Sequence, residues 1–446
     1  MNEELSFNTK FLFYPSIIRL LADGRHIAIS RESGNWIILD NEIELALFHQ
    51  LYKGATIGEI VDSYGLTNED FMNSFQRVLA KIAAREFAGI ENLPEITKLE
   101  GFKMLNLYVT NSCNLRCPQC FMNAGVAMEN ELSFADLKCI LTDFKDNGGE
   151  CATFTGGEPM MRKDFVGLLQ FSKELGLQNT VLTNGLLWSQ EDINKAVNFI
   201  DEVQISIDGV DDDTNSHIRG KGNFDRAVRT AKIFAANGVK VSIATTFSKS
   251  DLSTDLISKY KIIKEDIEGV AKGEITFKFS KKILLGRGIA PTEKENRDYF
   301  EKISAIEDAI RPNVKLENFL LGHQPNTISP NCGIGGISIR ADGHVFFCNR
   351  VHEVDDYGYV FSRPIKEWME IGREINDRTS VDHVEPCCKC DLKKICNGGC
   401  RIDDFNNNGK TLSDNEWIQD TCSEEKKQLL IEKMTKVFDY YYDFSQ

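Results

Sequence analysis

Three closely spaced cysteines, Cys113, Cys117 and Cys120, lie in the stretch CNLRCPQCFMN, directly after the apolar, strand-like run LNLYV. A structural zinc ion takes four ligands, and no further Cys or His follows until Cys139, which we expect on the buried stripe of a helix. Three thiolates suit instead a cubane iron-sulfur cluster that keeps one iron free of protein ligands. Such an iron can bind a small molecule directly, so the motif predicts a cluster that takes part in chemistry.

A second set of cysteines lies toward the C-terminus. It contains Cys332, Cys348, Cys387, Cys390, Cys396, Cys400 and Cys422, with Gly343 between the first two. CxxC pairs also bind zinc, so a zinc ribbon is the alternative to an iron-sulfur site. We expect Cys139 and Cys151 to be buried small hydrophobic residues, and Cys388 to be a bystander.

Composition and charge limit the kinds of partner. A chain of 446 residues is expected to form two or three domains, and its net charge of -15 argues against a nucleic-acid-binding surface. The most apolar early stretch, FLFYPSIIRLL, is shorter than a bilayer span and contains Pro15 and Arg19, so we expect no membrane partner. We therefore expect a cytoplasmic protein. In that compartment, thirteen cysteines indicate metal binding rather than disulfides.

From Leu105 onward, apolar strand candidates alternate with amphipathic helical runs. The strand candidates are LNLYV, CATFT, NTVLTN, VQISIDG, KVSIATTF and EITFKFS. Repeated strand and helix units predict a parallel α/β sheet, either doubly wound or curled toward a barrel. Functional groups should gather where such strands end, and the cysteine loop, GGEP, TNG and SIDG follow strand candidates.

The two ends of the chain show different patterns. Near the N-terminus, the strand candidates HIAIS and NWIIL precede three helical runs, a pattern typical of a small winged-helix unit, and its acidic charge disfavours DNA binding. From about Pro325, short strands, glycines and cysteines predict a segment stabilised by metal. The run EEKKQLLIEKMTKVFDYYYDF predicts a final helix.

The motif CxxxCxxC after the first strand, with TGGEP after the second, resembles the radical S-adenosylmethionine (radical SAM) superfamily. The resemblance implies a partial (β/α)6 TIM-like barrel and a 4Fe-4S cluster on Cys113, Cys117 and Cys120. S-adenosylmethionine would bind the fourth iron and be cleaved by one electron to a radical that abstracts hydrogen. Gln119 departs from the family, which usually carries an aromatic residue there, and Phe121 follows the third cysteine instead.

The same resemblance assigns the contacts of the cofactor. The backbone of Gly156 and Gly157, together with Glu158, would take the methionyl ammonium, and Ser206 would bond the carboxylate or the ribose. Arg219 would pair with the carboxylate, with Arg226 as the alternative. The remaining contacts, near ribose and adenine, would come from Asn184, which is otherwise a turn residue, and from the turn Gly286, Arg287 and Gly288.

The seven C-terminal cysteines resemble the SPASM extension of radical SAM enzymes that modify peptides. The resemblance implies two auxiliary 4Fe-4S clusters, three clusters in all. One would be held by Cys387, Cys390, Cys396 and Cys422, and the other by only Cys332, Cys348 and Cys400. Because no cysteine lies between Cys151 and Cys332, we expect an open iron that binds a substrate thiolate, unless Asn331 or His323 completes the set.

The run LDNEIELALFHQLYKGATIGEIVDSYG resembles winged-helix domains that bind the leaders of precursor peptides by adding them to a sheet edge. The predicted domains are a leader-recognition domain (1–95), a radical SAM partial barrel (101–325), a SPASM auxiliary-cluster domain (326–424) and a C-terminal helix (425–446).

The resemblance as a whole implies an oxidoreductase that cross-links a ribosomally made precursor peptide, most simply through a Cys sulfur-to-carbon thioether. It would be supplied with electrons by a donor such as ferredoxin or flavodoxin. Alternatives are a carbon-carbon cross-link, a formylglycine-generating sulfatase maturase, and a non-catalytic iron-sulfur scaffold that binds peptides. Asp208, Glu317 and His323 are candidates for a catalytic base, and the sequence singles out none of them.

Overall fold

The computed structural model describes residues 5–65, 69–99, 103–253, 255–283, 287, 291–312, 314–329, 331–352, 354–402, 405–406, 418–419 and 422–442. The chain divides into two compact units. The smaller unit consists of Met1–Glu100, Asn313–Gly333 and Asn376–Gln446, and the larger consists of Gly101–Pro312 and Ile334–Ile375.

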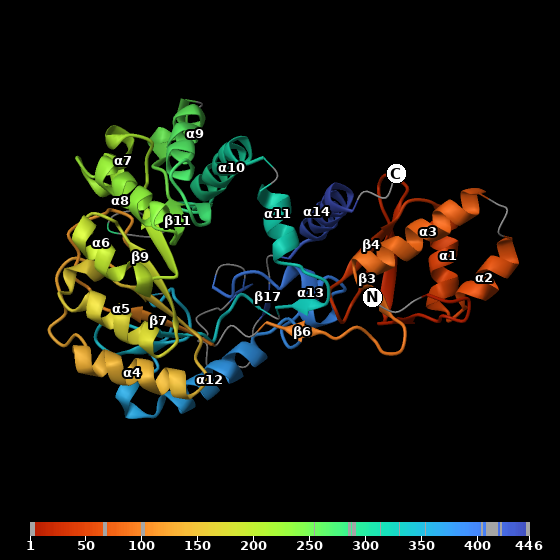
Figure 1. Ribbon diagram of the computed structural model, residues 1–446, viewed down its shortest axis with the longest axis horizontal. Coiled ribbons are helices and arrows are strands. Elements are labelled where there is room, and N and C mark those ends of the chain that lie inside the picture. Colours follow the sequence, from red (N-terminus) through yellow and green to blue (C-terminus); the bar gives the residue numbers. More distant parts are fainter. Residues whose placement is uncertain are drawn as a thin grey trace. The chain divides into compact units, whose positions relative to one another are not determined.

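The larger unit is built on one eight-stranded sheet with the order β12-β11-β10-β9-β8-β7-β14-β15. The strands that form the barrel run parallel to one another and are β7 (Met104–Tyr108), β8 (Cys151–Thr155), β9 (Gln178–Thr183), β10 (Glu202–Ser206), β11 (Lys240–Thr245) and β12 (Ile275–Phe279). Each strand pairs with the next one in the sequence, and the helices between them lie along the outer side of the sheet (Figure 1). This arrangement confirms the predicted partial barrel.

Amphipathic helices cover the sheet. They are α4 (Phe134–Asp146), α5 (Phe165–Glu174), α6 (Gln190–Ala196), α7 (Asp212–Arg219), α8 (Phe224–Ala236), α9 (Asp255–Glu268) and α10 (Glu293–Ile310). Several begin with a capping box: the hydroxyl of Ser133, for example, accepts a hydrogen bond from the Asp136 N–H while the Asp136 carboxylate accepts one from Ser133.

The prediction that Cys139 and Cys151 are buried was wrong. The buried stripe of α4 contains Leu137, Ile140 and Leu141, which places Cys139 on the solvent side of the helix, where it is exposed. On β8 the burial alternates along the strand, and Cys151 is on the less buried face. Neither thiol is therefore part of the apolar core.

Two of the short strands expected in the cysteine-rich segment extend the barrel sheet, and this pairing was not predicted. β14 (Ile337–Ile339) pairs in parallel with β7, and β15 (Val345–Phe346) pairs antiparallel with β14. α12 (Ile365–Arg378) follows. Strands this short acquire their stability from the long-range partner, which a local pattern does not reveal.

The smaller unit contains a three-stranded antiparallel sheet in the order β2-β3-β4, with β2 (Ser16–Leu20), β3 (His26–Ser30) and β4 (Trp36–Leu39). The helices α1 (Glu42–Tyr52), α2 (Ile57–Tyr64) and α3 (Glu69–Ala84) follow it. This confirms the predicted winged-helix pattern. A separate pair joins β1 (Leu12–Phe13) to β5 (Ala88–Gly89).

C-terminal elements share the apolar core of this sheet. They include α11 (Val314–Leu321), α13 (Lys393–Cys396) and α14 (Glu424–Tyr441). Separately, two small sheets pair β6 (Thr97–Lys98) with β13 (Thr327–Ile328) and β16 (Phe405–Asn406) with β17 (Ile418–Gln419). Trp36 of β4 packs in one cluster with Phe319, Leu392 and Met434, and its indole donates a hydrogen bond of 3.3 Å to the Met434 carbonyl. The N-terminal residues therefore do not form a core of their own, and the predicted functional domain boundaries stay a prediction.

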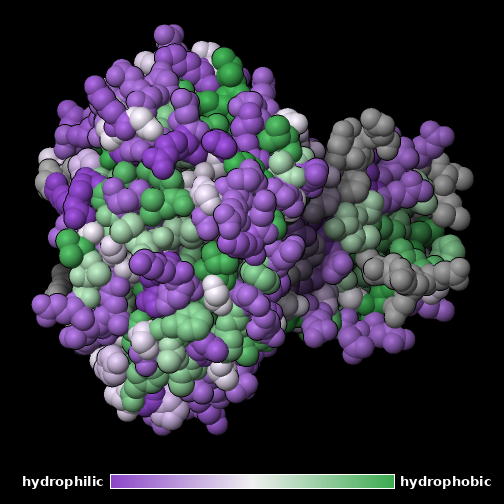
Figure 2. Space-filling model, turned by 60° about the vertical axis from the view of Figure 1, so that its left-hand side comes forward, coloured by the Kyte–Doolittle hydropathy of each residue, from purple (hydrophilic) through white to green (hydrophobic). Residues whose placement is uncertain are grey.

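On the face shown in Figure 2, hydrophilic side chains predominate and apolar ones form scattered patches. Among the described helices, none combines the length and the apolar character needed to cross a bilayer.

Candidate metal and cofactor sites

A cavity of about 260 Å³ lies where the parallel strands β7 to β11 end. Residues from the ends of β8, β9, β10 and β11 and from the cysteine loop after β7 line it. They include Cys113, Cys117, Cys120, Gly156, Gly157, Asn184, Ser206 and Arg219. Nearly all the residues assigned to the cluster and the cofactor from the sequence are thus brought together, at the edge where a parallel α/β sheet places its functional groups.

The glycine pair holds the cysteine loop against the end of β8. The Gly157 N–H donates to the Thr110 carbonyl at 2.7 Å. A Cβ atom on Gly156 would lie 2.3 Å from the same carbonyl oxygen, and one on Gly157 would lie 2.2 Å from the Ser112 oxygen. Gly156 also has a φ of +141°, a conformation that favours glycine. Packing against the loop is therefore one reason for glycine at both positions.

The three cysteines of the loop are partly buried, and backbone N–H groups lie close to two of their sulfur atoms. The N–H groups of Leu115 and Ala124 each lie 3.4 Å from a sulfur atom, that of Cys113 and that of Cys120 respectively. Burial raises the pKa of the Cys113 and Cys117 thiols, so binding of a metal would displace protons from them.

The spacing of these thiols does not suit a single metal ion. Within the described ranges, no three Cys, His, Asp or Glu side chains converge closely enough to hold one. A cubane cluster is bound differently, because each thiolate ligates a separate iron atom. Three thiols around one cavity therefore fit a cluster.

Glu158 lies behind the cavity wall. Its carboxylate is fully buried and accepts hydrogen bonds from the Thr183 hydroxyl at 2.7 Å and from the Asn184 N–H at 2.7 Å. Burial raises the pKa of Glu158, although these bonds oppose the rise. The carboxylate thus ties the end of β8 to the TNG turn after β9, and its direct contact with a cofactor ammonium stays a prediction.

Asn184 is a turn residue that also lines the cavity, and its contact with the ribose or adenine of a cofactor stays a prediction. Its side-chain oxygen accepts a hydrogen bond from the Leu186 N–H at 3.0 Å, as in a turn. Its side-chain N–H donates to the Asn114 oxygen at 2.8 Å, which links the turn to the cysteine loop. Asn184 also lines the cavity, so its backbone and side chain hold this wall in place.

Arg219 is held by a buried carboxylate. Its Nε donates to Asp208 at 2.6 Å, and the other oxygen of Asp208 accepts from the Thr246 N–H at 2.7 Å. Burial lowers the pKa of Arg219, but the charge of Asp208 outweighs this and the pKa is raised overall. Because both oxygens of Asp208 are bonded to the chain, this residue positions Arg219 rather than presenting a free base. Arg226 bonds the Leu186 carbonyl and does not line the cavity.

Replacing Arg219 with lysine should weaken binding of S-adenosylmethionine about tenfold, because lysine keeps the charge but loses the planar fork that matches a carboxylate. Isothermal titration of the anaerobically reconstituted protein measures this change. Arg226→Lys is the matched control and should bind as the wild type does. Equal weakening in both variants would contradict the assignment to Arg219.

Sequence reasoning missed several residues of this cavity. Gln204 and Thr246 line it, although neither stands in a recognised motif, and so does Thr155, the first residue of TGGEP, to which no role was assigned. Gln204 precedes Ser206 by two positions on β10, so the alternation of side chains along a strand would have placed both on one face. Gln119 and Phe121 both line the cavity as well.

The predicted turn at Gly286, Arg287 and Gly288 is only partly visible. Both glycines lie outside the described residues. Arg287 donates a hydrogen bond of 2.6 Å to the Asn123 side chain and bonds the Ala124 carbonyl, next to the cysteine loop.

A second cavity, of about 670 Å³, lies within the smaller unit. All four cysteines of the predicted closed set line it, namely Cys387, Cys390, Cys396 and Cys422. Burial raises the pKa of Cys387 to about 11. Cys332 and Cys400 belong to the same unit and are not among the residues that line this cavity, and their assignment to a different cluster stays a prediction.

Both non-cysteine candidates for completing that other cluster already have bonding partners. The two ring nitrogens of His323 lie 2.7 Å and 2.8 Å from the carbonyls of Phe319 and Ile395. The side chain of Asn331 donates to the Asn376 carbonyl at 2.8 Å and accepts from the Gly333 N–H at 2.8 Å. These bonds are compatible with a cluster that has only three protein ligands.

Comparisons with known proteins agree with the barrel and the cysteine loop. The model of the Radical SAM superfamily matches residues 107–249. The mycofactocin maturase MftC of Mycobacterium tuberculosis is 33% identical over 320 residues, which cover 67% of this chain and 78% of the relative. Fe-coproporphyrin III synthase of Methanosarcina barkeri is 25% identical over 365 residues, which cover 72% of this chain and 88% of the relative. The structure of Streptococcus suis SuiB bound to the precursor peptide SuiA is similar in fold, with a TM-score of 0.52 and 18% identity over 94% of this chain and 98% of that one.

Proposed function

Because the chain belongs to the radical SAM superfamily, we propose that it is a maturase that binds a ribosomally made precursor peptide and forms an intramolecular cross-link in it. The cross-link is a thioether between a Cys sulfur and a carbon atom of the peptide. A peptide substrate is supported by the similarity to MftC, which is named a maturase, and to SuiB, which was solved with a precursor peptide. The protein works in the cytoplasm with an electron donor such as ferredoxin or flavodoxin.

The observation that carries this proposal is the meeting of three thiols, two glycines and Arg219 in one cavity. When bound there, a 4Fe-4S cluster and S-adenosylmethionine supply hydrogen-atom abstraction after reductive cleavage. Cys113, Cys117 and Cys120 hold the cluster, and Arg219 orients the carboxylate of the cofactor. The bonds of Glu158 and Asn184 keep the wall rigid, which holds the reacting groups in place.

The C-terminal cysteines provide the second half of the proposal. Cys387, Cys390, Cys396 and Cys422 hold one auxiliary cluster. Cys332, Cys348 and Cys400 hold another with an open iron, which binds the thiolate of the substrate. Metal coordination would lower the pKa of that thiol and fix its sulfur in place. Bond formation between the thiolate and a substrate carbon radical releases one electron, which the auxiliary clusters would accept.

Mass spectrometry of the Cys-containing precursor peptide encoded beside the gene tests this proposal, after incubation with reduced, reconstituted protein and S-adenosylmethionine. A thioether lowers the peptide mass by two hydrogen atoms and protects the cysteine from alkylation. The same mass loss with an alkylatable thiol indicates a carbon-carbon link instead. An unchanged peptide in the presence of cofactor cleavage would overturn the proposal, and conversion of a sulfatase-derived peptide alone would favour a sulfatase maturase.

A further inference from the structure

Arg401 is a charged side chain in the interior of the smaller unit, directly after Cys400 in the sequence. Its exposed fraction is 0%. Burial of a charge is costly unless polar groups or opposite charges surround it. The guanidinium group donates hydrogen bonds to three backbone carbonyls, those of Thr379 at 2.7 Å, Asn397 at 3.0 Å and Gly399 at 2.7 Å. These bonds fix the position of the cation without neutralising its charge.

Two of these carbonyls belong to the turn 397–399, which joins Cys396 of the predicted four-cysteine set to Cys400 of the predicted three-cysteine set. All three residues of the turn have left-handed backbone, with φ values of +55°, +74° and +81°. A Cβ atom on Gly398 would lie 3.0 Å from Nη1 of Arg401, so glycine lets the turn approach the guanidinium group closely. Arg401 therefore holds the segment that connects the two sets.

The third carbonyl links Arg401 to the segment around Cys332. It belongs to Thr379, whose hydroxyl donates to the Asn376 carbonyl at 3.4 Å. The same carbonyl accepts from the Asn331 side chain at 2.8 Å, and the Asn376 side chain donates back to Asn331 at 3.0 Å. Asn331 directly precedes Cys332. Arg401 thus belongs to a polar network that reaches both predicted sets of cysteines.

The charge of Arg401 acts on thiols of both sets. Burial lowers the pKa of Arg401, and the charges of four thiols oppose this change. They are the thiols of Cys332, Cys387, Cys400 and Cys396. In return, burial raises the pKa of Cys387 and the charge of Arg401 opposes that rise. Because arginine keeps its proton in proteins, a permanent cation lies within electrostatic reach of both sets.

A buried cation at this place would change the redox behaviour of clusters that these thiols hold. A cluster ligated by thiolates becomes more negative when it is reduced, and its net charge is one of the factors that set its reduction potential. A nearby positive charge in a medium of low dielectric constant stabilises the reduced form more than the oxidised form. The reduction potential is therefore raised, and the cluster becomes a better electron acceptor.

We propose that Arg401 is a positioning residue that serves both auxiliary clusters. It holds the turn between Cys396 and Cys400, and its buried positive charge raises the reduction potentials of the two clusters. Formation of the thioether releases one electron from the peptide, and a raised potential favours the one-electron reduction of an auxiliary cluster that takes it up. This inference rests on the proposed function, because it takes the two cysteine sets as cluster ligands.

Two replacements of Arg401 separate its charge from its hydrogen bonds. Arg401→Gln removes the charge and keeps a donor for the carbonyls, whereas Arg401→Lys keeps the charge and loses the planar fork. The measurement is an anaerobic redox titration of the reconstituted full chain, followed by electron paramagnetic resonance. All chains also carry Cys113→Ala, Cys117→Ala and Cys120→Ala, so that only the auxiliary clusters contribute to the signal.

Arg401→Gln should lower the ratio of reduced to oxidised cluster at a fixed potential at least about tenfold for both auxiliary clusters, which corresponds to ~59 mV for a one-electron couple. Arg401→Lys should keep both ratios within about twofold of those with arginine, because the charge remains. Arg31→Met is the matched control, since it also removes a guanidinium group from the smaller unit. Arg31 is 42% exposed and pairs with Asp391 at 3.0 Å, so water screens its charge and both ratios should stay unchanged.

Unchanged ratios in Arg401→Gln, equal shifts in the two Arg401 variants, or a shift confined to one cluster overturn the proposal and leave the proposed function standing. If Arg401→Gln does not bind clusters, Arg401→Lys decides alone: ratios near those with arginine support the proposal, and a fall of about tenfold despite the retained charge overturns it. The expected shifts in a protein that cross-links no peptide would support the role of Arg401 and overturn the cross-linking function.

Discussion

Cys117→Ser should abolish cleavage of S-adenosylmethionine by the reconstituted protein. One thiolate fewer leaves two ligands for a cluster that needs three, so the cluster should be lost from this cavity. We expect about four fewer iron atoms per chain, the content of one 4Fe-4S cluster. The rate of 5'-deoxyadenosine formation should fall by about a thousandfold or more, which corresponds to ~4 kcal/mol in the barrier. Iron analysis and liquid chromatography of the nucleoside measure the two effects.

Cys139→Ser is the matched control for this variant. Cys139 is an exposed thiol on α4 and does not line either cavity, so its loss should change neither the iron content nor the cleavage rate. If Cys117→Ser kept the full iron content and the full rate, the cysteine loop would not be the cluster site. If both variants lost iron, the effect would come from general damage to the chain.

The location of this site could be predicted from the sequence because it follows from the order of strands. Motifs that directly follow parallel strands must meet at one edge of the sheet, and Cys113, Gly156, Asn184 and Ser206 do so. Gln204 could have been added from its position on the same face of β10 as Ser206. Thr246 could not, because nothing in its local sequence marks it as lying in the cavity.

The motif residues have structural roles that the sequence does not separate from their chemical ones. Gly156 and Gly157 carry no side chain because a Cβ would meet the Thr110 and Ser112 carbonyls. Glu158 uses its carboxylate to bond the turn after the next strand. In both cases a pattern of residue types gives the position of the site, whereas the contacts depend on how the loops fold against one another.

The shared core of the smaller unit was beyond prediction because it joins segments far apart in the chain. Trp36 packs with Phe319 and Met434, which no local periodicity connects. The consequence is practical, since deletion of residues 1–95 would expose the C-terminal part of that core as well as remove the winged-helix elements. Point variants are therefore a sharper test of peptide recognition than this deletion is.

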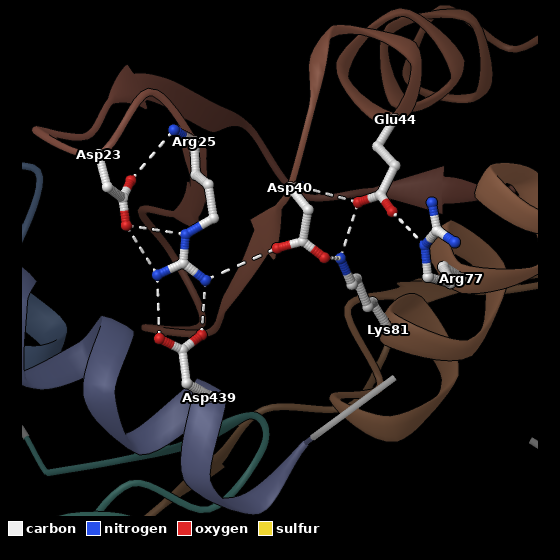
Figure 3. A network of polar contacts seen from close by, with 7 residues as sticks. All are labelled: Asp23, Arg25, Asp40, Glu44, Arg77, Lys81 and Asp439. Atoms are coloured by element: carbon white, nitrogen blue, oxygen red, sulfur yellow. Dashed lines mark hydrogen bonds and ion pairs between the residues drawn. The ribbon is translucent and has the colours of Figure 1, made fainter. Parts of the chain in front are cut away.

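Lys81→Met should destabilise the smaller unit by about 3 kcal/mol or more. Lys81 is 1% exposed and bonds the carboxylate of Glu44, which is fully buried, at 2.7 Å, and that of Asp40 at 2.6 Å (Figure 3). Removing the Lys81 cation leaves the Glu44 carboxylate buried. Of the cations drawn in this network, only Arg77 then pairs with it, through its Nε at 2.8 Å. Breaking a buried ion pair from one side costs ~3–5 kcal/mol. Urea unfolding followed by tryptophan emission measures the loss.

A double variant separates charge from packing. Adding Glu44→Gln to Lys81→Met removes the unpaired anion and should restore part of the lost stability. Lys195→Met, which breaks an exposed pair with Glu191, is the control and should leave the midpoint unchanged. If the double variant were no more stable than Lys81→Met, lost packing rather than the buried charge would explain the effect.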